Sequence, residues 1–160
     1  MPRNTGRVDK CFLQVDFRNA FNTVDRAAML LQVRLHMRGL SPWAECCYDH
    51  HSRLLFHHSP LSSEAGVQQY NPLGPLLFAL ALHPALQAAA AGGPELAFAF
   101  LDDSYLTGGS KQVAAGLARL TAASRQVGLK LNPSNQHGRF DIIYRNESLY
   151  SDECRYSDNL

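Results

Sequence analysis

The amino-acid sequence predicts one domain in which short strands and longer helices share a single central sheet, of the α/β or α+β class. Apolar runs of strand length alternate along the chain with apolar repeats of helical spacing. Glycine or proline stands at the ends of several of these segments. The chain has 160 residues, 46% of them hydrophobic, and is long enough to bury a core without disulfides.

The first half of the chain begins with a strand at residues 10–17, a short apolar run that carries an aspartate near its end. A helix follows at residues 25–37, because apolar side chains recur there at helical spacing before Gly39. Ser41 and Pro42 predict the start of the next helix, with Ser41 as the N-cap and proline in the first turn.

The second half continues as hairpin, loop, helix, hairpin, helix and strand. Glycines at the segment ends separate these elements, and a turn pair divides the first hairpin. The predicted ranges are residues 53–56 and 61–65 (divided by Ser59 and Pro60), 66–71, 73–91, 95–101 and 104–107, 110–127, and 129–131. We expect a domain at residues 8–132 and a divergent polar tail at residues 133–160 that forms at most a weak hairpin.

Charge and composition exclude several classes of protein. The chain carries 15 Lys and Arg against 14 Asp and Glu. This near balance argues against a protein that grips nucleic acid by charge alone, because such proteins normally have a clear surplus of Lys and Arg. Residues 1–10 have no apolar signal segment, and the richest apolar stretch, residues 73–82, is too short to span a bilayer. We therefore expect an intracellular protein of the nucleus or cytoplasm that is neither secreted nor membrane-bound.

Cysteine and histidine pairs at residues 46–51 (CCYDHH) raise the alternative of a zinc site. Their spacing is not the C-x2-C spacing of structural zinc sites, and adjacent ligands rarely converge on one tetrahedron. We interpret them as loop side chains, with the zinc site as the less favoured alternative.

Three aspartates stand where apolar strands end. Asp16 follows the first strand, and Asp102 and Asp103 occupy the turn between two apolar strands. If these strands are neighbours, three carboxylates gather at one edge of the sheet, where Mg²⁺ or Mn²⁺ would neutralise them. Two such ions, about 3.5–4 Å apart, can promote phosphoryl transfer. The alternative is that the Asp-Asp pair serves the turn itself, because aspartate favours turns.

Four ordered segments together resemble the palm domain of reverse transcriptases, especially those of non-LTR (LINE-like) retroelements. They are residues 15–24 (VDFRNAFNTV), 66–78 (GVQQYNPLGPLLF), 98–103 (FAFLDD) and, more weakly, 128–133 (GLKLNP). The resemblance implies an α+β fold, the ferredoxin-like β-α-β-β-α-β palm of a right-hand polymerase. Its antiparallel central sheet has helices on one face.

The resemblance also implies catalytic residues. Asp16 and Asp102 would be the principal ligands of two Mg²⁺ or Mn²⁺ ions, Asp103 the third carboxylate, and the Phe17 carbonyl a backbone ligand. The activity implied is RNA-directed DNA polymerisation by metal-dependent nucleotidyl transfer.

For the nucleotide, the resemblance implies that Phe21 lies beneath the incoming sugar and that Gln69 touches the incoming deoxynucleoside triphosphate. The other partners would be an RNA template and a DNA primer. Core packing is the alternative for Phe21, because an aromatic residue just before a helix is commonly buried.

Two departures from the family pattern favour a second interpretation. Tyr70 stands where the family has glycine, and we expect it either to strain the loop or to fill the site. No lysine follows Lys130, where the family usually supplies one shortly after this segment. We expect a partial or degenerate palm without fingers or thumb. The alternative function is an inactive retroelement remnant that binds nucleic acid or a protein partner, and a nucleotidyl cyclase on a similar core is a third candidate.

Overall fold

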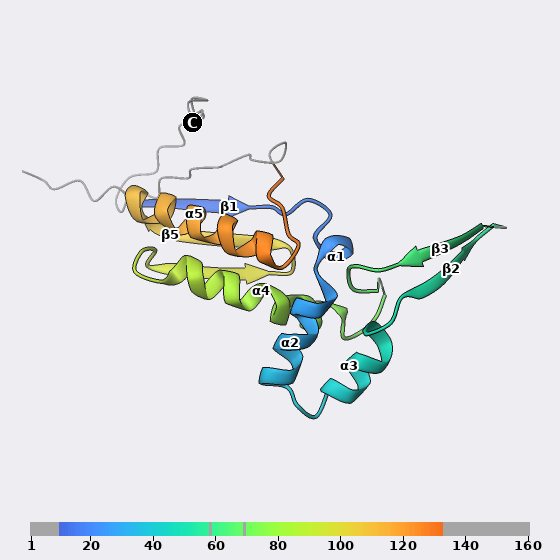
Figure 1. Ribbon diagram of the computed structural model, residues 1–160. Coiled ribbons are helices and arrows are strands. Elements are labelled where there is room, and N and C mark those ends of the chain that lie inside the picture. The colour runs from blue at the N-terminus through green and yellow to red at the C-terminus, as the bar shows by residue number, and fades with distance from the viewer. Residues whose placement is uncertain (1–9, 58, 69, 133–160) are drawn as a thin grey trace, which may run out of the picture.

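A computed structural model describes residues 10–57, 59–68 and 70–132 and shows a mixed α+β architecture (Figure 1). The tail at residues 133–160 and its expected hairpin lie outside the described residues. The elements are β1 (Lys10–Val15), α1 (Ala20–Thr23), α2 (Arg26–His36), α3 (Ser41–Tyr48), β2 (Ser52–Phe56), β3 (Ser59–Ser63), α4 (Gly74–Ala90), β4 (Leu96–Phe100), β5 (Asp103–Gly109) and α5 (Ser110–Gln126).

The main sheet has three strands in the order β1-β5-β4. Both outer strands run antiparallel to β5, so β1 and β4 are parallel to each other with β5 between them. Val15 pairs with Ser104 at one end of the β1–β5 ladder, and Phe98 pairs with Tyr105 in the β4–β5 ladder. The predicted antiparallel sheet is therefore confirmed, although β2 and β3 form a separate hairpin.

Helices α4 and α5 lie side by side across one face of this sheet (Figure 1). Alternate strand residues such as Leu13, Val15 and Leu106 point into the layer between sheet and helices and are buried. The fully buried helical side chains that meet them include Leu77, Phe78, Leu82, Val113 and Leu120. The helices lie on one face of the sheet, as expected.

The opposite face of the sheet carries a row of aromatic side chains. Tyr105 on β5 stacks against Phe98 on β4, with ring centroids 4.8 Å apart, and contacts Phe12 on β1 at 5.5 Å. These rings belong to the strand positions that alternate with the buried ones, so they lie on the face of the sheet opposite the helices. The three rings are half-buried or exposed there.

Local capping explains where α2 begins and corrects the predicted start of α3. The Asp25 carboxylate accepts a hydrogen bond from the Ala28 N–H at 2.7 Å and caps α2. The N-cap of α3 is Leu40 rather than Ser41, because the Leu40 carbonyl accepts the first helical bond, from Ala44. The Ser41 hydroxyl donates to the Glu45 carboxylate at 2.8 Å instead of capping the backbone.

The turn of the β2–β3 hairpin falls two residues earlier than predicted. Ser59 and Pro60 are not the turn but the first residues of β3, and Pro60 pairs with Leu55. A proline is tolerated here because β3 is the edge of a two-stranded sheet. The turn instead includes His57, whose φ of 55° lies in the left-handed region.

A strand was expected at residues 129–131. In the described part of the chain this segment forms a single antiparallel bridge, between Leu131 and Phe17, instead of a strand. The short helix α1 was not predicted. No helix among the described residues has both the length and the apolar character needed to cross a membrane.

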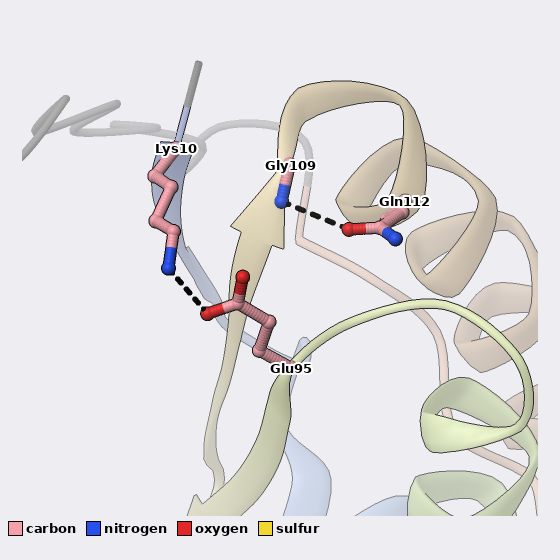
Figure 2. A network of polar contacts seen from close by, with 4 residues as sticks. All are labelled: Lys10, Glu95, Gly109 and Gln112. Atoms are coloured by element: carbon pink, nitrogen blue, oxygen red, sulfur yellow. Dashed lines mark hydrogen bonds and ion pairs between the residues drawn. The ribbon is translucent and has the colours of Figure 1, made fainter. Parts of the chain in front are cut away.

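Two polar contacts tie together the end of the sheet where β1 begins (Figure 2). Lys10 pairs with Glu95 at 2.9 Å, so the first residue of β1 is linked to the residue that precedes β4. The Gly109 N–H donates to the Gln112 side chain at 3.1 Å and satisfies a backbone donor where β5 passes into α5.

The loop after β3 packs directly on the segment that follows β1. The Gly66 N–H donates to the Val24 carbonyl and the Val67 N–H to the Phe21 carbonyl, both at 2.8 Å. Gly66 has a φ of 77°, and a Cβ there would lie 2.6 Å from the Phe21 carbonyl oxygen. Only glycine fits, because the close approach and the backbone conformation both exclude a side chain.

We expect Gly66→Ala to lower the free energy of unfolding by about 2 kcal/mol or more, because the methyl group meets fixed backbone. Gly39→Ala is the matched control, since nothing lies within 4 Å of a Cβ there, and it should change stability by less than about 0.5 kcal/mol. Urea denaturation of both variants measures the difference. Equal stabilities would contradict this account of the loop.

Candidate functional site

The structure brings the segments of the three predicted aspartates to one end of the main sheet. Val15 and Ser104 form the last pair between β1 and β5, so Asp16 and Asp103, the next residues, lie at the same end. Asp102 lies in the two-residue turn that joins β4 to β5. The neighbouring strands expected from the sequence are therefore present.

Amide side chains hold two of these carboxylates. Asn132 donates from Nδ2 to the Asp16 carboxylate at 2.9 Å, and its backbone N–H donates to the Asp16 carbonyl at 3.0 Å. Gln14 donates from Nε2 to the Asp103 carboxylate at 3.2 Å. Each of these two carboxylates is thus oriented by a neutral amide donor.

The three aspartates do not converge into one ligand cluster. Within residues 10–57, 59–68 and 70–132, no three His, Cys, Asp or Glu side chains are grouped so that they could hold a metal ion. This finding also covers the Cys and His side chains at residues 46–51. The oxygen donors at the sheet end suit Mg²⁺ or Mn²⁺ in type, but their side chains would have to turn to bind one ion together.

Three of the four positive φ values among the described non-glycine residues fall in the three candidate segments, and those of Tyr70 and Leu101 are strained because only glycine, asparagine and aspartate adopt them readily. Among the described non-glycine residues, φ is positive at Asn19, His57, Tyr70 and Leu101 only. Asn19 lies three residues after Asp16, Tyr70 lies in the loop before α4, and Leu101 directly precedes Asp102. Strain of this kind persists where the surrounding structure enforces it, and it is common at functional sites.

The turn before β5 shows this strain most clearly. Phe100 pairs with Asp103, so Leu101 and Asp102 alone connect the strands. Leu101 has a φ of 57° at the first turn position, a value that residues other than glycine, asparagine and aspartate rarely adopt. A left-handed conformation costs an L residue roughly 1–2 kcal/mol, so the turn keeps Asp102 at the sheet end against a local preference.

Tyr105 lies two residues beyond Asp103 on the open face of the sheet. Burial of its hydroxyl, and secondarily the negative charge of Asp103, raises the pKa of Tyr105 above its ordinary value. Tyr105 therefore stays a neutral donor and acceptor next to the aspartates throughout the neutral pH range.

Phe21 and Phe17 both take part in packing. The Phe21 ring is half-buried and stacks on Phe78 of α4, with centroids 4.6 Å apart and an interplanar angle of 23°. Phe17 is buried and bridges to Leu131. For Phe21, the packing alternative is thus realised in this structure, and the same contact fixes the ring between α1 and α4.

The loop before α4 contains the other predicted nucleotide contact. Gln69 lies outside the described residues. Its neighbour Tyr70 has a φ of 64° and is 100% exposed. Of the two effects expected for this tyrosine, it strains the loop and does not fill a site.

Sequence reasoning missed Arg26, a buried charge that holds this loop. Its guanidinium donates to the Gly66 carbonyl at 2.9 Å, the Ser63 carbonyl at 2.7 Å and the Ser63 hydroxyl at 2.9 Å. It also lies over the Tyr48 ring, 5.5 Å from the centroid. The available signal was its helical register, because Arg26 shares one face of α2 with the buried Met29 and Val33.

Tyr48 continues this network toward α4. Its hydroxyl accepts hydrogen bonds from the Gln68 N–H at 3.2 Å and from the Asn71 side chain at 2.9 Å. The Asn71 side-chain oxygen in turn accepts from the Leu73 N–H at 3.0 Å, just before α4 begins. Arg26 and Tyr48 therefore position both ends of the described loop.

No protein-family model matches the chain, and a search of curated proteins finds no match.

We expect Tyr70→Gly to raise the free energy of unfolding by roughly 1 kcal/mol, because glycine adopts the positive φ without strain and the exposed ring loses no packing. Tyr70→Phe keeps the backbone strain and should match the wild type. Urea denaturation midpoints compare the three proteins. A glycine variant less stable than the phenylalanine variant would show that the Tyr70 backbone is not strained.

We expect Tyr48→Phe to destabilise the protein by about 1 kcal/mol, because the Gln68 N–H and the Asn71 amide lose a common acceptor. Hydrogen exchange should locate the effect: the Gln68 amide exchanges faster, while amides of β5 stay protected. Unchanged exchange at Gln68 would mean that the hydroxyl does not hold the loop.

Proposed function

We propose that this chain is the palm segment of a reverse transcriptase of the non-LTR type, which joins deoxynucleotides to a DNA primer by metal-dependent nucleotidyl transfer. The observation that carries the proposal is the meeting of three separate segments. Asp16 and the Asp102–Asp103 turn lie at one end of the sheet, and the loop at residues 66–67 bonds to the backbone of residues 21–24.

The topology supports a ferredoxin-like palm. The parallel strands β1 and β4 are connected through helices and separated by β5, which is a split β-α-β arrangement. After α5 the chain returns to the β1 side of the sheet, where Leu131 bridges to Phe17. If this bridge is counted as a shortened fourth strand and the separate β2–β3 hairpin is left out, the remaining elements follow the order β-α-β-β-α-β.

In this proposal Asp16, Asp102 and Asp103 hold Mg²⁺ or Mn²⁺ through carboxylate oxygens, with the Phe17 carbonyl as a further oxygen donor. Two bound ions would activate the attacking primer oxygen and stabilise the leaving pyrophosphate. The protein's own part is orientation: Asn132 and Gln14 direct two of the carboxylates.

The nucleotide would lie between the aspartates and the loop before α4. Phe21, held by its stack on Phe78, would support the sugar of a deoxynucleoside triphosphate, and Gln69 would contact the same nucleotide. The RNA template would lie along the loop and α4, whose start is fixed by Tyr48 and Asn71.

An inactive remnant that binds nucleic acid or a protein partner is the second candidate. Two observations favour it. No three acidic side chains of the described residues converge, and Tyr70 occupies a strained glycine-like position in the loop. This candidate keeps the fold and the binding surfaces but not the reaction.

The test is primer extension on an RNA template with Mg²⁺ or Mn²⁺. We expect Asp16→Asn and Asp102→Asn each to reduce extension by roughly 100-fold or more, because each removes a metal ligand. Asp25→Asn is the matched control, because Asn caps a helix as well as Asp does, and it should extend like the wild type.

Equal extension by all four proteins would indicate a contaminating polymerase and remove the proposal. If none extends the primer but the wild type still binds a labelled RNA–DNA hybrid in an anisotropy titration, the inactive remnant is the better description.

A further inference from the structure

We propose that the outer edge of β4 is an interface between two copies of this chain, which pair antiparallel and join their sheets into one. This proposal does not rest on the function proposed above.

β4 lies at the edge of the main sheet and pairs on one side with β5. On the other side of β4, no described strand forms hydrogen bonds with the N–H and C=O groups of residues 96–100 that point away from β5. Such an edge favours the addition of another strand. Proteins usually protect an edge with lysine, proline or a bulge, but the sequence LAFAF has no charge and no proline, and its register with β5 is unbroken.

The side chains of this edge are more exposed than is usual for their type. Leu96 is 51% exposed, Phe98 39% and Phe100 71%. They alternate along β4 and so share the open face of the sheet, and Leu101 in the turn extends the patch. A continuous apolar patch on a strand edge indicates an interaction surface.

The sequence of β4 is self-complementary in an antiparallel pair, which identifies a second copy as the occupant. With Phe98 on the two-fold axis, each Phe98 faces its counterpart, Ala97 faces Ala99 and Leu96 faces Phe100. Every opposed pair is apolar, and large side chains meet large ones. A two-fold interface needs this kind of self-matching surface.

The charges next to β4 do not oppose this register. Pairing in this register stops at Phe100, because Leu101 and Asp102 turn toward β5, and Glu95 of the second copy lies beside that turn. Glu95 is already paired with Lys10 of its own chain at 2.9 Å. None of the residues paired across the two-fold axis, 96–100, carries a charge.

The expected dimer is weak. Complete burial of the exposed parts of Leu96, Phe98, Phe100 and Leu101 in both copies removes at most about 800 Å². Stable interfaces bury more than ~1,000 Å². Backbone hydrogen bonds between the two β4 strands add to this area, so dimer should accumulate only at high protein concentration.

Sedimentation velocity of the full chain over a concentration series tests the proposal, under reducing conditions because Cys46 is exposed. The wild type should shift from 17.7 kDa toward twice that mass. Leu96→Lys or Phe100→Glu alone should raise the dissociation constant at least ~10-fold, since each places a charge opposite an apolar side chain. The double variant should recover dimerisation, because each lysine then faces a glutamate.

Leu35→Lys on α2 is the control, because Leu35 is 60% exposed and distant in sequence from β4; it should dimerise like the wild type. Circular dichroism and the melting temperature confirm that each variant is folded. A wild type that stays at 17.7 kDa overturns the proposal. So do single variants that dimerise normally, or a double variant that does not recover. If the monomeric wild type instead binds single-stranded DNA and Phe100→Glu loses that binding, the occupant is nucleic acid.

Discussion

The buried guanidinium of Arg26 is the interaction on which the arrangement of the candidate site depends. A buried charge is stable only when its donors are satisfied, and Arg26 uses the oxygens of Ser63 and Gly66. Any movement of that loop would leave the charge without partners. Because Gly66 and Val67 also bond to the backbone of residues 21–24, α2, the β3 end and the segment after β1 form one unit.

The same unit sets the surroundings of the aspartates. Phe21 stacks on Phe78 and so connects the segment after Asp16 to α4. The turn between β4 and β5, in which Leu101 is strained, keeps Asp102 at the same end of the sheet. The candidate site is therefore assembled by contacts between residues far apart in the sequence. The positive φ values at Tyr70 and Leu101 are ones that the short-range preferences of these residues oppose.

Much of the fold follows from local patterns. Apolar spacing and end signals located α2, α4 and α5 to within a residue or two, because these helices bury one regular face. Local patterns failed where a distant partner decided the outcome. Pro60 reads as a turn residue but lies in an edge strand, and Ser41 reads as a cap but bonds to Glu45. The three aspartates were predicted to gather at one edge of the sheet; their segments lie at one end of it, but their side chains are not grouped so that they could hold a metal ion. The role of Arg26 depends on the Ser63 and Gly66 carbonyls, which no local pattern reveals.

The proposed function requires Asp16, Asp102 and Asp103 to bind divalent cations together, although their side chains are not grouped for this in the structure. Titration of isotope-labelled protein with Mn²⁺, followed by paramagnetic broadening of amide signals, tests this directly and independently of activity. We expect the amides of these three residues and of Phe17 to broaden first and together. Broadening that begins instead at exposed carboxylates such as Asp49 or Glu64, or that reaches Asp16 and Asp102 at separate Mn²⁺ concentrations, would contradict it.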